Sequence, residues 1–181
     1  MQTRDHHFSR LSGGLLLMLA ALATAPAAHA QSATSDSRAV TIGPLSVVNT
    51  APLEFGDMIA GASAGTVFID TRNNNVTSSG GVTLAGGNPS RANFIIYGTR
   101  NQVVDVTIAG STTITHANGT DSMLINQMGI GNGGRNFGTF VRGRLPNAGV
   151  YNLTVGGRLN VDANQTDGEY SGTFTMTVDY L

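Results

Sequence analysis

The chain has 181 residues, a formal net charge of −1, 24 glycines and no cysteine. Without cysteine no disulfide can form, and because all 10 basic residues are arginines, lysine Schiff bases and Lys–Asn isopeptide bonds are excluded as well. The near-balanced charge and the lack of a basic cluster give no support to binding of nucleic acid or an anionic membrane.

The first residues have the pattern of a secretory signal peptide. Arg4 and Arg10 precede an apolar run from Leu15 to Leu22, and Ala28-His29-Ala30 is a small-residue cleavage site. The apolar run is shorter than the roughly 20 residues that a membrane-spanning helix needs. We therefore expect residues 1–30 to be removed during export, with the mature protein first in the periplasm and then at the cell surface or in a fimbrium.

The remaining chain is divided into an N-terminal extension, residues 31–48, and a single domain, residues 49–181. Short apolar runs alternate with glycine-rich and asparagine-rich turns, and no window has apolar residues at helical spacing. The pattern predicts an all-β antiparallel sandwich or barrel. The strands expected after the signal peptide are Val40–Ile42, Leu45–Val48, Thr66–Asp70, Val82–Leu84, Asn93–Tyr97, Val103–Ile108, a strand at Ile114, Met123–Ile125, Phe137–Val141, Tyr151–Val155, Leu159–Val161 and Tyr170–Tyr180.

Two further segments carry predictions. Gly129–Asn136 consists mostly of glycine and asparagine, which predicts a flexible loop. The C-terminal segment has the most regular alternation in the chain, with threonines and an aspartate on the outward face and Gly172 as a gap in the inward row. This period of two predicts a half-buried strand. Its inward row is Tyr170, Phe174, Met176, Val178 and Tyr180.

Reactive groups are sparse in the mature chain. His116 is its one histidine, so no His/Cys cluster can hold a metal, and no serine lies in a G-x-S-x-G motif. Two segments each carry acidic residues close together in the sequence, and nothing in the sequence shows that the two groups face each other across a cleft. These are Glu54 and Asp57, and Asp162, Asp167 and Glu169. We expect no enzyme activity, no cofactor and no metal.

Four motifs resemble a proteobacterial family of secreted domains of unknown function, number 4402. The motifs are Leu53-x-Phe55-Gly56, Gly65-Thr66-Val67-x-Ile69-Asp70, Gly157-x-Leu159-x-Val161 and Gly168-x-Tyr170-Ser171-Gly172. The tail is also similar to chaperone–usher pilins of the spore coat U or archaic type, which end in an alternating strand with a penultimate tyrosine, here Tyr180, and an upstream glycine, here Gly168. Gly56 and Gly172 are the other motif glycines. Pilins of this group often carry a cysteine near the first strand, and this chain has none.

The resemblance implies an immunoglobulin-like antiparallel β-sandwich that lacks its last strand. It implies a groove lined by Tyr170, Phe174, Met176, Val178 and Tyr180, which first contacts a periplasmic chaperone. An outer-membrane usher then assembles like subunits, with Val40 and Ile42 of one subunit acting as the donor strand for the next. On this interpretation the chain is a non-catalytic structural subunit of a pilus or fimbria.

The residues leave an alternative open. Ala39–Val48 could instead pair within its own sheet and close the fold. The chain would then be a self-complete secreted β-sandwich, stable as a monomer without a chaperone, that binds a surface glycan or a protein partner.

Overall fold

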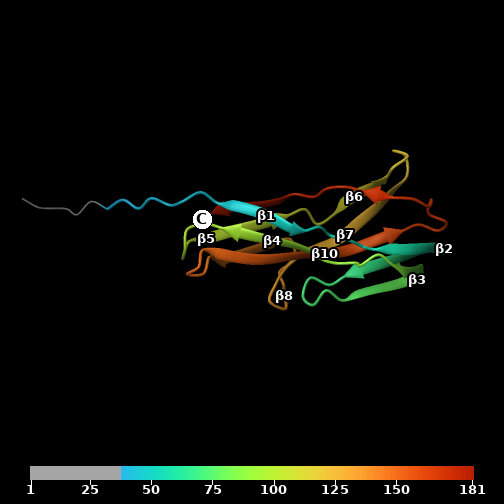
Figure 1. Cartoon of the computed structure of the whole chain (residues 1–181), viewed down its shortest axis with the longest axis horizontal. Coiled ribbons are helices and arrows are strands. Elements are labelled where there is room, and N and C mark those ends of the chain that lie inside the picture. The colour runs from blue at the N-terminus through green and yellow to red at the C-terminus, as the bar shows by residue number, and fades with distance from the viewer. Residues whose placement is uncertain (1–37) are drawn as a thin grey trace, which may run out of the picture. The chain divides into compact units, whose positions relative to one another are not determined.

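A computed structural model describes residues 38–181, of which Thr41–Leu181 form one compact unit (Figure 1). The expected signal peptide and residues 31–37 lie outside the described part. Residues 38–181 form twelve strands, and none of these residues is helical. The strands are β1 (Ser46–Ala51), β2 (Asp57–Ile69), β3 (Val76–Gly86), β4 (Ala92–Tyr97), β5 (Val103–Ile108), β6 (Thr112–His116), β7 (Ser122–Asn132), β8 (Arg135–Asn136), β9 (Phe140–Arg144), β10 (Val150–Val161), β11 (Tyr170–Ser171) and β12 (Met176–Tyr180).

The strands form two antiparallel sheets around a common core. In the larger sheet the order is β1-β4-β10-β7-β6-β11, with β2 beside β10, β3 beside β2 and β8 beside β7. The smaller sheet has the order β12-β5-β9. Inward residues of both sheets, such as Ile96 and Leu159 of the larger and Val104 and Val106 of the smaller, belong to one buried cluster. The predicted all-β antiparallel sandwich is thus confirmed.

β10 is the central strand of the larger sheet. One edge pairs with β7, and the other pairs first with β4 and then, from Gly157 onward, with β2. The sequence prediction of two separate strands here, Tyr151–Val155 and Leu159–Val161, is wrong. Gly156 and Gly157 lie inside β10 and do not end a strand. Position 156 requires glycine, because the carbonyl oxygen of Ile69 occupies the space that a Cβ would need.

β2 and β3 pair as a hairpin, and each is longer than the strand predicted for it from the sequence. The predicted strands were Thr66–Asp70 and Val82–Leu84. Gly80 and Gly81 lie inside β3 instead of forming a turn at its start. Gly80 has a φ of +70°, and the backbone of Ser63 lies where a side chain on Gly81 would be. Glycine therefore allows an irregular, very close approach of the two strands.

The predicted flexible loop at Gly129–Asn136 is also wrong. β7 continues through this segment to Asn132, and its Ile130 is fully buried. A Cβ on Gly131 would lie 2.6 Å from Oγ1 of Thr154 and 2.7 Å from the Thr71 carbonyl oxygen, so the glycine allows close packing. The turn is confined to the residues between β7 and β8.

The C-terminal segment keeps its predicted alternation but divides between the two sheets. β11 pairs with β6 in the larger sheet, and β12 pairs with β5 in the smaller one, while residues 172–175 cross between them. All five inward residues are half-buried, whereas the threonines and the aspartate between them are exposed. The prediction of one continuous strand from Tyr170 to Tyr180 is therefore corrected. The predicted assignment of its residues to an inward and an outward face is right.

Neither predicted donor residue lies in a strand. Val40 is 81% exposed and Ile42 is 47% exposed. β1 begins at Ser46, inside the segment that the sequence assigned to the N-terminal extension, and it includes the expected strand residues Val47 and Val48.

Candidate binding groove

A groove of about 920 Å³ opens between two parts of the chain that are far apart in sequence. One wall comes from the end of β1 and the residues that lead into β2, and the other comes from residues 165–174. β1 and β11 are outer strands of the larger sheet, and β12 is an outer strand of the smaller one. Among residues 38–181, no strand pairs with the free edge of any of these three.

The floor of the groove is the hydrophobic core itself. β4, β6, β7 and β10 each present inward residues there, and most of them belong to the buried cluster. Such a floor is typical of a sandwich whose two layers are not covered along one side. The floor residues are Phe94, Ile114, Met123, Ile125, Leu159 and Val161.

The wall on the β1 side carries three apolar side chains among polar ones. Leu53, Phe55 and Met58 line it. Further along the same edge, Val47 is directly opposite the fully buried Ile96 of β4, so both side chains lie on the core face of the sheet. Val47 is nevertheless 38% exposed, because no neighbouring strand covers this edge.

The opposite wall contains two of the five residues that the sequence predicted for the groove. Tyr170 and Phe174 line it directly. Met176, Val178 and Tyr180 continue the same half-buried row along β12, but they do not line this groove. The floor residues were not predicted, because they come from four strands whose pairing is not evident in the sequence.

All three motif glycines line the groove, and each has a steric reason to be glycine. Gly56 has a φ of +75°, and its Cβ would lie 2.5 Å from the Gly86 carbonyl oxygen. Gly168 has a φ of +140°, and the ring of His116 occupies the place of its side chain. A Cβ on Gly172 would lie 2.6 Å from the Thr113 carbonyl oxygen. The walls therefore approach their neighbours more closely than other residues allow.

His116, the last residue of β6, anchors the wall that includes Tyr170. Its Nδ1 accepts a hydrogen bond from the Asn118 amide at 2.9 Å, so its Nε2 carries the hydrogen that is donated to the Asp167 carbonyl oxygen at 3.0 Å. Its ring packs edge-on against Tyr170, with centroids 4.8 Å apart. These contacts give His116 a structural role.

Tyr180 closes the far end of the row. Its hydroxyl donates to the Gly43 carbonyl oxygen at 3.0 Å and accepts from the Thr99 amide at 2.7 Å. The Gly43 amide in turn donates to Oγ1 of Thr99 at 2.7 Å. A Cβ on Gly98 would lie 2.6 Å from the Tyr180 hydroxyl, so glycine is needed beside it.

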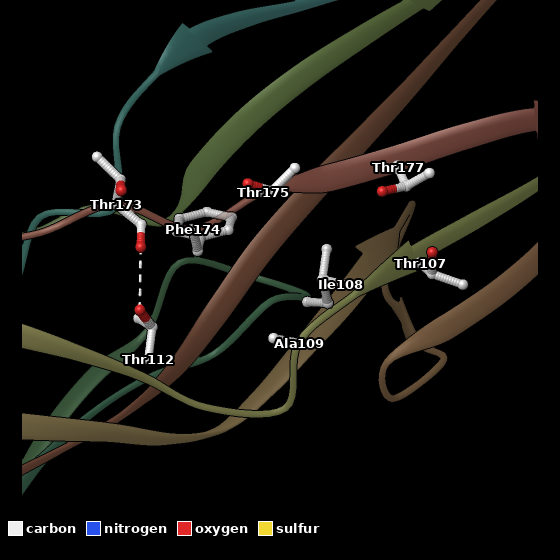
Figure 2. A pocket seen from close by; sticks show the side chains of 8 residues that line it. All are labelled: Thr107, Ile108, Ala109, Thr112, Thr173, Phe174, Thr175 and Thr177. Atoms are coloured by element: carbon white, nitrogen blue, oxygen red, sulfur yellow. Dashed lines mark hydrogen bonds between the residues drawn. The ribbon is translucent and has the colours of Figure 1, made fainter.

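A second hollow, of about 420 Å³, lies where the C-terminal segment crosses between the sheets (Figure 2). Phe174 and Ile108 give it an apolar floor, and threonine side chains surround them. Oγ1 of Thr112 donates to the Thr173 carbonyl oxygen at 2.9 Å, which fixes the crossing segment to β6. Thr112, Thr173 and Phe174 line both hollows, so the two lie beside each other.

Acidic residues from the two walls meet at the same groove. Glu54 and Asp57 come from one wall, Asp167 and Glu169 come from the other, and all four are exposed. Within residues 38–181, no group of three or more histidine, aspartate or glutamate side chains could hold a metal ion. These exposed carboxylates give the walls of the groove a negative charge, whereas its floor is apolar.

No helix within residues 38–181 is long and apolar enough to cross a membrane.

The fold and the groove together define an antiparallel β-sandwich in which core residues floor a groove beside strands that have a free edge. A sequence family described as "Domain of unknown function (DUF4402)" matches residues 45–180, a range that includes every strand of both sheets. The chain belongs to the DUF4402 family, as its motifs predicted. No curated protein and no solved structure matches the chain.

Proposed function

We propose that the chain is a non-catalytic structural subunit of a pilus or fimbria, which assembles by accepting a strand from another subunit in its groove. The observation that carries the proposal is that core residues floor a groove whose two walls include parts of β1 and β11, strands that each have a free edge. An unpaired edge presents a row of free amide and carbonyl groups, which favours pairing with an added strand. A strand placed there could pair with β1 and β12 and cover the core.

The segment before β1 supplies a suitable strand. Val40 and Ile42 alternate with Ala39 and Thr41. Neither residue lies in a strand, and the side chains of both are exposed. Burying these two side chains would contribute about 1.5–3 kcal/mol each, and therefore roughly 3–6 kcal/mol in total. Since a domain is stable by only about 5–15 kcal/mol, such a strand would add substantially to the stability of its acceptor.

The proposal includes a cellular route. Residues 1–30 act as the export signal, a periplasmic chaperone covers the groove before assembly, and an outer-membrane usher replaces the chaperone with the next subunit. The similarity of the tail to chaperone–usher pilins supports this route. The apolar floor supports it as well, because an uncovered groove of this kind favours aggregation.

Paired aspartate substitutions on β12 and the crossing segment test the proposal. Phe174→Asp with Val178→Asp places charge on the groove face, whereas Thr175→Asp with Thr177→Asp places the same charge on the exposed face of the same segment. We expect the first pair to abolish fibre assembly and the second to leave it intact. Normal fibres from the groove-face variant would overturn the proposal.

The second candidate function is that of a self-complete domain that binds a surface glycan or protein. It is favoured by the hollow in Figure 2, whose threonine hydroxyls surround the apolar side chains of Phe174 and Ile108. A hollow of this composition offers hydrogen bonds and a ring face together. This function requires a stable monomer, so the oligomeric state of the exported protein distinguishes the two candidates.

A further inference from the structure

The N-terminal segment is held at one residue before it reaches β1. Both backbone polar groups of Gly43 are bound by side chains: its amide donates to Oγ1 of Thr99, and its carbonyl accepts from the hydroxyl of Tyr180. The same hydroxyl accepts from the Thr99 amide, so the three residues form a closed set of hydrogen bonds. We call this set of Gly43, Thr99 and Tyr180 the Gly43 clasp.

The clasp lies where the chain would have to turn to fill its own groove. Residues 31–42 could reach the free edge of β1 only as the first strand of a hairpin that turns at Gly43 and Pro44. Hairpin pairing beside a tight turn needs backbone amide and carbonyl groups at the turn. Pro44 has no amide hydrogen, and both groups of Gly43 are already engaged in the clasp. Self-pairing therefore requires the clasp to open.

We propose that the Gly43 clasp directs the N-terminal segment away from its own groove, so that the groove receives this segment from a second copy of the chain. The inference rests on the proposed function and deepens it by naming the positioning residues, Tyr180 and Thr99, that favour the intermolecular arrangement. Residues 31–42 are long enough for it, since at about 3.3 Å per residue they reach about 40 Å, and the row from Tyr170 to Tyr180 spans about 35 Å.

The absence of cysteine from the chain permits a direct test. Val40→Cys is combined with Met176→Cys in one exported full-length protein and with Val178→Cys in another, and both are oxidised and separated on non-reducing gels. A disulfide between copies gives covalent multimers. A disulfide within one copy gives a monomer with altered mobility.

The same cysteine pairs are then placed in chains that carry Tyr180→Phe, Thr99→Val or the outward control Thr177→Ala. Tyr180→Phe removes both hydroxyl bonds and keeps the ring, while Thr99→Val removes only the acceptor of the Gly43 amide. We expect multimers in the parent and the control, and at least a threefold shift toward the internally linked monomer in each clasp variant. The two clasp variants act independently, so poor folding of one leaves the other as the test.

The outcomes separate the inference from the proposed function. Multimers whose fraction is unchanged in both clasp variants would overturn the inference alone. Internally linked monomers in the parent protein would overturn it too, because the clasp would not then prevent self-pairing. No disulfide at either position in the parent would mean that the segment does not enter the groove at all, which contradicts the proposed function.

Discussion

The ring of Phe174 packs edge-on against the ring of Phe94, with centroids 5.9 Å apart and planes at 68°. Phe94 belongs to the groove floor in β4, and Phe174 belongs to the segment that crosses between the sheets. Edge-to-face pairs of this kind are favourable beyond the area they bury. The contact therefore fastens the crossing segment to the core midway between β11 and β12.

Removing this ring should weaken the fold measurably. Because Phe174 is only half-buried, we expect Phe174→Ala to lower the free energy of unfolding by about 2 kcal/mol, below the 3–5 kcal/mol typical of a fully buried phenylalanine. Urea denaturation of the chain without residues 31–42 measures this value free of assembly. The exposed neighbour Thr175→Ala should change it by less than about 0.5 kcal/mol. Equal effects of the two substitutions would contradict the packing described.

Gly168 should not accept a side chain. Its φ of +140° is unfavourable for other residues, and a Cβ would collide with the His116 ring. We expect Gly168→Ala to destabilise the protein by about 1–3 kcal/mol and to lower its melting temperature by several degrees. Gly110→Ala is the matched control, because its Cβ would meet only a methyl group of Thr139 at 3.4 Å. A melting temperature unaffected by Gly168→Ala would show that this wall is more tolerant than its geometry indicates.

Asp70 should give the protein a pH-dependent contribution to stability. Its side chain is 10% exposed and bound by the guanidinium of Arg72, which holds the pKa of Asp70 below its usual value of 3.8. A lowered folded pKa means that the carboxylate stabilises the fold above about pH 4 and that the contribution is lost as the pH falls through the lowered pKa.

We therefore expect Asp70→Asn to cost about 1–3 kcal/mol at pH 7, and less as the pH falls below 3.8. Chemical denaturation at a series of pH values measures the difference between the two proteins. Asp162→Asn, at an exposed carboxylate, serves as the control. A cost for Asp70→Asn that stays constant from pH 7 to pH 3 would refute the charged pairing.

Arg142 should control the titration of Asp105 on the outer face of the smaller sheet. Its Nε and one terminal nitrogen donate to the two carboxylate oxygens at 2.7 and 2.6 Å, which lowers the pKa of Asp105. We expect the pKa of Asp105 to rise in Arg142→Ala, as followed by NMR of the carboxyl carbon. An unchanged titration would mean that the ion pair does not persist in solution.

Strand patterns could be predicted from the sequence wherever side chains alternate without interruption. The predicted strand Val103–Ile108 coincides with β5, and the inward faces of the C-terminal segment are right as well. The division of that segment between two sheets could not be predicted. Alternation continues through residues 172–175, while the hydrogen-bonding partner changes from β6 to β5, and a change of partner leaves no mark on a single sequence.

Glycines account for most of the wrong strand boundaries. Gly81, Gly131 and Gly156 lie outside the predicted strands, but each is inside a strand of the structure, where a neighbouring backbone or side chain fills the place of its Cβ. A sequence alone does not separate glycine used for a turn from glycine used for close packing, because both uses depend on the absent side chain. The groove floor was missed for a related reason, since it is created by pairings between distant strands.

The most direct test of the central claim is the gel mobility of the exported protein, with and without boiling in detergent. A subunit bound through a buried strand resists detergent at room temperature, because the whole strand must leave at once. The account predicts a ladder of multimers that boiling removes and that is lost when residues 31–42 are deleted. A single monomer band, unchanged by the deletion and by boiling, would contradict it.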